Sequence, residues 1–470
     1  MSFVVYDLTF LVLFSLAIGI FLYKKRKKLD KEGIMFLYRT KFGLKIIDYL
    51  GKKHPRTMKF LSYIIVFSGY VLMLLMTYFL WQMVALFFKP EFVRLVKIPP
   101  LMPIIPYLPE IFKVDWLPPF YFTYWIVALA IVALVHEGAH GIFARFYGVK
   151  IKSTGFGFLG PFLAFFVEQD DKQMTKKKIF PQLTILGAGV FANILVGFIF
   201  FLLMVGFSVM AYSPAGVMFN DYSYSVGNGS MVKDINFLNQ TLVIDGLNLT
   251  KIELYNQTYY IPEETRELYS NLTADTPIKF YHDLPAINQA IKGFIVQINE
   301  QEIKTYNDIN ISGQFKPGDN ITLVTKEIVG KNKTFHTYNI TLGESYQTEG
   351  TAALGTVVLQ QRRNTIGSWI FKWTNSFREP YTYYEPKYNA ELIIFIYNLF
   401  WWVVIINISV ALSNMLPAFI FDGGRFWYLT VLAITKREKI ATGVLRVFTW
   451  ILLGVLALLM LLWAKGIFFK

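Results

Sequence analysis

Residues 120–147 of the chain read FYFTYWIVALAIVALVHEGAHGIFARFY, an apolar run that carries two histidines and a glutamate near its end. Residues four positions apart lie on the same face of an α-helix, so His136 and His140 can bind one metal ion from successive turns. Glu137 lies beside them. This is the H-E-x-x-H pattern, in which the histidines bind zinc and the glutamate acts as a general base.

The pattern is specific in this chain. With 5 histidines in 470 residues, chance would produce roughly 0.002 matches, although spacing alone proves no metal. The alternative is a pair of histidines that are hydrogen-bonded across a helix bundle. Ionisable groups inside a membrane are costly and usually functional, which favours the metal site.

The composition is that of a polytopic membrane protein. Hydrophobic residues make up 54% of the chain and charged residues only 17%, too apolar a balance for an ordinary soluble protein. The net charge of +14 comes from basic residues clustered in short loops beside apolar runs, a pattern that marks the cytoplasmic side and does not imply nucleic acid. The chain has no cysteine, so a metal site must use His, Asp or Glu.

Six apolar runs are long enough to span a bilayer. They lie at about residues 3–23, 60–88, 120–147, 181–211, 390–416 and 440–463. Five basic residues, Lys24 to Lys28, directly follow the first run, which predicts a retained anchor with its N-terminus outside. The other basic loops then fall on the same, cytoplasmic side.

The segment from Ser153 to Phe162 is apolar but short and rich in glycine. Backbone of this kind can lie at membrane depth only where protein or a water-filled cavity satisfies its polar groups. We expect an extended or re-entrant hairpin beside the metal site, with an edge in residues 155–161 that can pair with an unwound substrate strand. A plain surface loop is the alternative.

Residues 212–386 are polar, with strand-like alternation and turn residues, and predict a separate domain inserted between spans. Nine N-x-S/T sequons crowd into this region, which fits an extracytoplasmic surface. They begin at Asn228, Asn239, Asn248, Asn256, Asn271, Asn310, Asn320, Asn332 and Asn339.

Asp422 is the candidate third metal ligand. It is flanked by apolar residues and glycines at the cytoplasmic end of the fifth span, the depth expected for the two histidines. Hydrolytic zinc sites take three protein ligands and keep a position for water. The alternative is a helix cap or a turn residue.

Three motifs on separate membrane segments resemble those of the site-2 protease family of intramembrane metalloproteases. They are H-E-x-x-H at residues 136–140, G-x-x-x-N at residues 189–193 and N-x-x-P-x-x-x-x-D-G at residues 414–423. The resemblance implies three Zn²⁺ ligands, a catalytic base, and two polar groups that contact substrate or oxyanion. These are His136, His140 and Asp422 as ligands, Glu137 as the base, and Asn193 and Asn414 as the polar groups. Asn193 can instead simply bridge two helices.

The inserted region resembles the PDZ-like domains of this family. Residues 293–303 predict a strand, a turn at Asn299 and a second strand, and Lys316-Pro317-Gly318-Asp319 predicts a turn into a further strand. The inserted region is longer than one such domain. Its residues 213–280 are expected to be a permuted half of the domain, an insertion or a second divergent copy. The domain is expected to bind a peptide carboxyl terminus or to act as a size filter.

The chain is thus predicted to be an α-helical polytopic membrane protein with about six transmembrane helices and an inserted extracytoplasmic, mainly-β PDZ-like domain. Four parts are expected: an anchor with a basic segment (1–59), two catalytic halves (60–211 and 387–470) and the inserted domain (212–386). The predicted function is zinc-dependent hydrolysis within or near transmembrane helices of membrane-anchored substrates, in the cell membrane. The alternatives are a non-proteolytic membrane metal site and a PDZ-type membrane adaptor.

Overall fold

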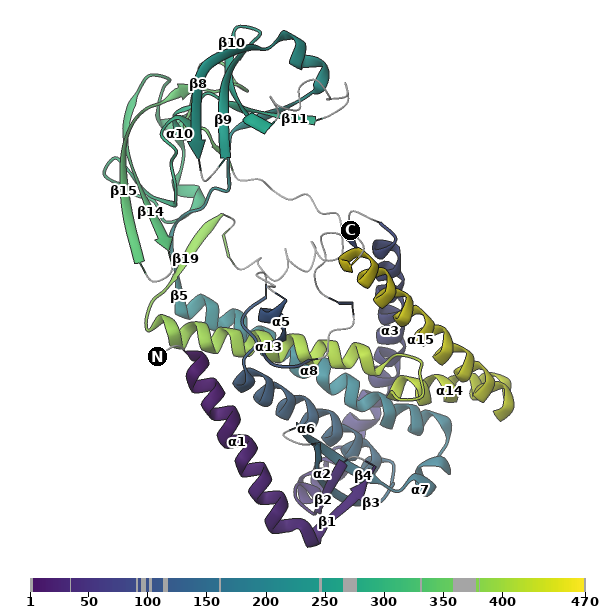
Figure 1. Ribbon diagram of the computed structural model, residues 1–470. Coiled ribbons are helices and arrows are strands. Elements are labelled where there is room, and N and C mark those ends of the chain that lie inside the picture. The colour runs from purple at the N-terminus through teal and green to yellow at the C-terminus, as the bar shows by residue number, and fades with distance from the viewer. Residues whose placement is uncertain are drawn as a thin grey trace. The chain divides into compact units, whose positions relative to one another are not determined.

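A computed structural model of the protein describes residues 3–33, 35–89, 92–93, 99–100, 104–112, 117–159, 162–244, 247–264, 277–329, 332–357, 378–379 and 381–468. Within these residues, six helices are long and apolar enough to cross a membrane (Figure 1). They are α1 (Phe3–Lys25), α3 (Pro55–Phe87), α6 (Phe122–Phe146), α8 (Ile179–Ala211), α13 (Ala390–Asn414) and α15 (Glu438–Phe468). The predicted helical membrane protein with an inserted, mainly-β region is confirmed.

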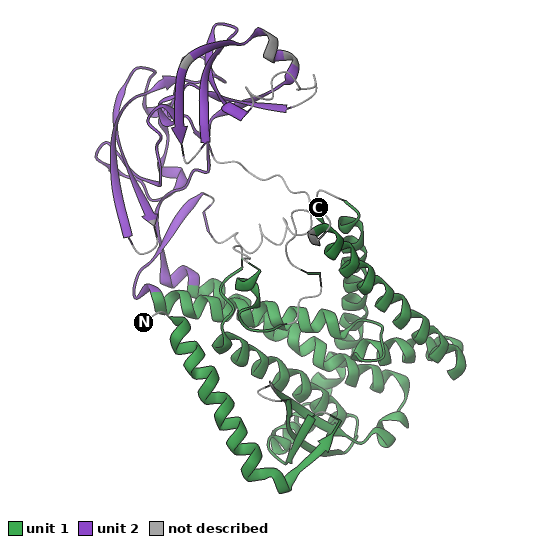
Figure 2. Ribbon diagram, viewed as in Figure 1, with its two compact units in different colours: residues 1–207, 391–470 green, residues 208–390 purple. Residues whose placement is uncertain are grey.

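The chain forms two compact units, residues 1–207 with 391–470 and residues 208–390 (Figure 2). The first unit holds the long helices and the second holds most of the strands. The finer division into four parts stays a prediction.

A four-stranded antiparallel sheet lies in the first unit, in the order β1-β2-β3-β4. Its strands are β1 (Leu29–Glu32), β2 (Met35–Thr40), β3 (Ile151–Leu159) and β4 (Phe162–Gln169). The predicted hairpin is therefore present, although its turn residues Gly160 and Pro161 lie outside the described part of the chain. The expectation that residues 155–161 supply a free edge is wrong, because β2 and β4 cover both sides of β3. In the described sheet, the edge strand next to β3 is β4.

Short helices accompany this sheet and the loops of the first unit. They are the 3₁₀ helix η1 (Arg26–Lys28), α2 (Leu44–Lys53), α5 (Leu108–Ile111) and α7 (Asp171–Thr175). Helix α2 packs closely against α6, since a Cβ on Gly51 would lie 2.8 Å from the carbonyl oxygen of Ile142.

Helix α14 (Asp422–Thr435) was not predicted from the sequence. It follows the break at Pro417, and two glycines at its start let the preceding loop fold tightly over it. A Cβ on Gly423 would lie 2.3 Å from the backbone of Met415, and one on Gly424 would lie 2.0 Å from that of Ala418. Gly423 of the third motif and the following Gly424 thus fix where Asp422 begins its helix.

A buried carboxylate joins α1 to the start of α6. Asp7 of α1 is 1% exposed and accepts hydrogen bonds from the backbone N–H of Phe122 at 2.7 Å and of Thr123 at 2.9 Å. The hydroxyl of Tyr107 also donates to it. The first N–H groups of a helix have no partner within the helix, and a negative charge is favourable there. Asp7 therefore caps α6 from a different helix.

The second unit contains a six-stranded sheet in the order β15-β14-β12-β5-β19, with β13 paired to β12. Its strands are β5 (Tyr212–Val217), β12 (Phe294–Ile298), β13 (Gln301–Glu302), β14 (Asn320–Val329), β15 (Asn332–Thr341) and β19 (Thr382–Pro386). The predicted turns at Asn299 and Gly318 are confirmed, with φ of 53° and 91°. Peptide binding by this region stays a prediction.

A five-stranded sheet in the order β7-β11-β10-β9-β8 also lies in the second unit. Its strands are β7 (Tyr224–Asn228), β8 (Asn236–Ile244), β9 (Leu247–Leu254), β10 (Gln257–Pro262) and β11 (Pro277–His282). In the other sheet, β5 and β12 are far apart in the chain but lie side by side and pair at Val217 and Ile295. Strands β6 to β11 thus lie in the chain between two strands that pair with each other, and the three interpretations of residues 213–280 stay a prediction.

Smaller elements complete the second unit. They are the strand pairs β6 (Asp221–Tyr222) with β18 (Thr356–Val357) and β16 (Gly343–Glu344) with β17 (Ala352–Ala353), helices α10 (Pro285–Asn288) and α11 (Ile311–Gln314), and the 3₁₀ helices η2 (Gly229–Asp234) and η4 (Tyr306–Asp308).

Candidate active site

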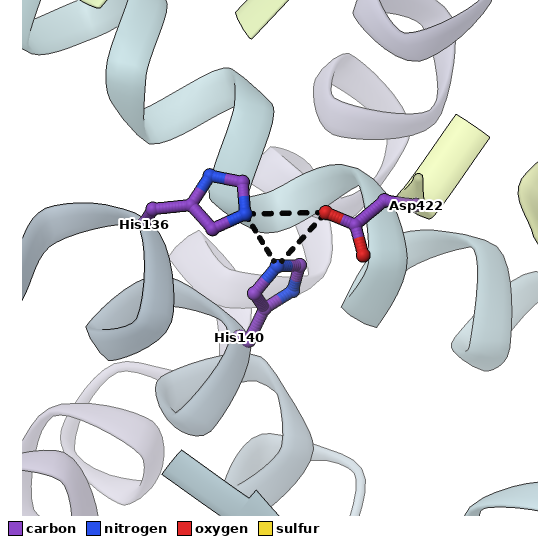
Figure 3. Close-up of side chains that lie close together, drawn as sticks. All are labelled: His136, His140 and Asp422. Atoms are coloured by element: carbon purple, nitrogen blue, oxygen red, sulfur yellow. Dashed lines mark hydrogen bonds and ion pairs between the residues drawn. The ribbon is translucent and has the colours of Figure 1, made fainter. Parts of the chain in front are cut away.

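Three predicted ligands meet in the first unit, although they come from two helices far apart in the sequence (Figure 3). Nε2 of His136 lies 3.1 Å from Nε2 of His140 and 3.1 Å from Oδ2 of Asp422. Nε2 of His140 lies 3.3 Å from the same oxygen. The two histidines are one turn apart on α6, and Asp422 is the first residue of α14.

The spacing and the chemistry of these three groups fit a zinc ion. A tetrahedral zinc ion at about 2.0–2.1 Å from each ligand atom separates those atoms by roughly 3.3–3.4 Å, close to the triangle described above. Imidazole nitrogen and carboxylate oxygen are both zinc donors. His136 and His140 are 7% and 6% exposed, whereas the side chain of Asp422 is 25% exposed. The two histidines are therefore buried, and Asp422 is partly exposed.

Helix α8 fixes the orientation of His140. Nδ1 of His140 lies 2.6 Å from the backbone carbonyl oxygen of Ile185. A carbonyl oxygen can only accept a hydrogen bond, so Nδ1 carries the hydrogen and Nε2 keeps its lone pair. This is the tautomer that a metal bound at Nε2 requires.

Gly189 of α8 lies against both imidazole rings. A Cβ at this position would lie 2.5 Å from Nε2 of His140 and 2.8 Å from Nδ1 of His136. No side chain fits there without moving the rings or the helix. The glycine of the G-x-x-x-N motif is thus explained by the close approach of α8 to the ligands.

The two predicted asparagines lie in different surroundings. Asn193 is fully buried, and its Nδ2 lies 3.1 Å from Nδ1 of His136. Asn414 is the last residue of α13 and is half-buried. Among the described contacts, no hydrogen bond joins Asn414 to the histidines, to Glu137 or to Asp422. The structure thus brings Asn193 to a ligand but does not do so for Asn414.

Glu137 is half-buried and lies beside the edge strand β4. Its carboxylate accepts a hydrogen bond of 3.3 Å from the backbone N–H of Val167. The partners that hold the site, the carbonyl of Ile185 and the N–H of Val167, are backbone groups. Sequence analysis missed them, because backbone groups carry no residue signal.

Comparison with known families agrees with this geometry. The model of Peptidase family M50 matches residues 124–457. The chain belongs to peptidase family M50. All six predicted site residues lie inside the match to the M50 family, and the resemblance to site-2 proteases is confirmed. With six apolar helices in the described part of the chain, this M50 member is a multi-pass membrane protein.

A relative is found in the archaeon Methanocaldococcus jannaschii, where the similar protein is described as uncharacterized. The two are 32% identical over 191 residues, which cover 40% of this M50 chain and 48% of the relative. The aligned part therefore spans about half the length of the curated relative.

Replacing Gly189 with alanine should weaken zinc binding, because the added methyl group collides with both imidazole rings. We expect about a tenfold or larger loss of zinc affinity, measured on the purified protein by competition with a chromogenic chelator. Gly206→Ala is the matched control, since a Cβ at Gly206 of α8 meets nothing within 4 Å. Equal zinc affinity of the two variants would contradict the role given to Gly189.

Proposed function

We propose that this M50 peptidase is a zinc-dependent protease that cleaves membrane-anchored proteins within or near their transmembrane helices, as in regulated intramembrane proteolysis. The observation that carries the proposal is the meeting of His136, His140 and Asp422 in a buried site, with Glu137 beside them. An ionisable cluster of this kind at membrane depth is expensive to maintain and is expected to be functional.

The three ligands would hold the zinc ion. When bound, zinc supplies Lewis acidity, which lowers the pKa of a water molecule and polarises a carbonyl group. Family membership supports this assignment, and so does the distance of each ligand atom from the other two.

Glu137 would act as the general base and then as the general acid. Its carboxylate takes a proton from the attacking water while the water oxygen bonds to the scissile carbonyl carbon. The same group then delivers that proton to the amide nitrogen as the C–N bond breaks. The N–H of Val167 holds the carboxylate in place beside the ligands.

A transmembrane substrate must unwind before it can react, because its carbonyl groups are hydrogen-bonded and shielded within a helix. We propose that the unwound segment pairs with the outer edge of β4. The N–H of Val167 points away from β3, toward Glu137. Because backbone groups alternate along an antiparallel strand, the N–H of Phe165 faces the same edge.

We also propose that the second unit is extracytoplasmic. Seven of its nine sequon asparagines have described side chains, and all seven are exposed. Asn271 and the side chain of Asn239 lie outside the described part of the chain. The basic loops between spans support the same topology, because they fall on the opposite side.

Glu137→Gln should abolish proteolysis while the site still binds zinc, because the amide cannot take up the proton. We expect cleavage of a reconstituted single-span substrate to fall by about 10²–10⁴-fold. Wild-type cleavage should stop on chelation and return with zinc. If wild type and variant bind zinc and neither cleaves any of several helix-destabilised substrates, the site is a non-proteolytic metal site. Unaltered cleavage by the variant would remove Glu137 from the mechanism.

Phe165→Pro should impair cleavage without disrupting the sheet. Proline removes the N–H that faces the outer edge, and an edge strand tolerates proline at such a position. The control is Phe165→Ala, which loses the same ring but keeps the N–H. We expect the proline variant to cleave about tenfold more slowly than the alanine variant, the equivalent of one hydrogen bond. Equal rates, with zinc binding intact in both, would argue against strand pairing at β4.

Single cysteines can test the topology, because the chain has none of its own. Tyr255 is exposed in the second unit, and Lys439 is exposed in the first turn of α15. A membrane-impermeant maleimide should label Tyr255→Cys on intact cells and Lys439→Cys only after permeabilisation. The reverse pattern would place the second unit in the cytoplasm.

A further inference from the structure

Asn193 lies on the far side of the His136 ring from the ligand atom. It is 0% exposed, and its amide group approaches Nδ1 of His136, whereas Nε2 faces Asp422. Asn193 is thus buried behind a metal ligand. This location differs from the substrate or oxyanion contact that the family resemblance implies for it.

The group that Nδ1 of His136 contacts determines which ring nitrogen carries the hydrogen. As placed, Asn193 presents its NH₂ group to Nδ1 at 3.1 Å. An NH₂ group donates, so Nδ1 would accept and the ring hydrogen would lie on Nε2. A neutral imidazole in that state has no lone pair for a metal at Nε2.

The acceptor that would reverse this arrangement is already present on the same side chain. Oδ1 of Asn193 is buried and has no hydrogen-bond partner within the described structure. A half-turn of the amide about its last bond would present Oδ1 to Nδ1. Nδ1 would then carry the hydrogen, and Nε2 would have its lone pair free.

We propose that Asn193 is a positioning residue that accepts a hydrogen bond from Nδ1–H of His136 through Oδ1. This inference rests on the proposed zinc site. It gives His136 the tautomer that the carbonyl of Ile185 gives His140. Both ligands would then be oriented by groups of α8, one a backbone carbonyl and the other a side-chain amide.

The test compares the affinity of the full-length protein for Zn²⁺ in wild type, Asn193→Leu and Asn193→Asp, by chelator competition. Leucine has no acceptor, so we expect zinc to bind about 10–100-fold more weakly, as when other outer-shell partners of a ligand histidine are lost. Aspartate keeps the acceptor and cannot donate when ionised, so it should restore affinity toward the wild-type value.

Asn407→Leu is the matched control. Asn407 is also 0% exposed, lies in α13, and donates to the backbone carbonyl of Val403 in its own helix. Losing this buried amide should leave zinc affinity unchanged, whatever it does to stability.

Three results would separate the possible failures. If Asn193→Leu binds zinc as tightly as wild type, the positioning role is wrong while the zinc site stands. If Asn193→Asp binds as weakly as Asn193→Leu in folded protein, the amide does not act as an acceptor and the proposal is overturned. If wild type binds no zinc, both the positioning role and the proposed function are wrong.

Discussion

The close approach of α8 to two imidazole rings is the contact on which the site depends. Metal ligands at membrane depth must be desolvated, held apart by the right distance and given the correct tautomer. Gly189 makes room for the rings, and the carbonyl of Ile185 orients one of them. Helix α14 then needs only to bring Asp422 to the remaining side.

The small sheet contacts Glu137, the proposed base, which lies beside the two histidines on α6. Strand β4 lies at an edge of the described sheet and donates a backbone N–H to Glu137. One strand therefore lies next to Glu137 and, within the described sheet, has no neighbouring strand on its outer side. The proposed cleavage of an unwound chain within a membrane would use both features, because exposed peptide groups are costly there.

Much of this arrangement was predictable from residue type and spacing. The apolar runs predicted the six long helices of the described chain, and Asp422 was chosen because two histidines leave a hydrolytic zinc site one ligand short. Helix α14 was missed because Pro417 and two glycines indicate a turn. The strands β1 and β2 were missed because they lie in a segment rich in basic residues, whose sequence shows no clear strand pattern. The edge of β4 depends on pairing between distant segments, which local patterns do not encode.

The cap that Asp7 places on α6 joins the start of the histidine-bearing helix to α1. Separating α1 from α6 would strip the hydrogen bonds from a buried carboxylate and from the first N–H groups of the histidine-bearing helix. These two helices are therefore expected to move as one body. Under the proposed function, a transmembrane substrate that enters from the lipid should therefore pass between helices other than α1 and α6.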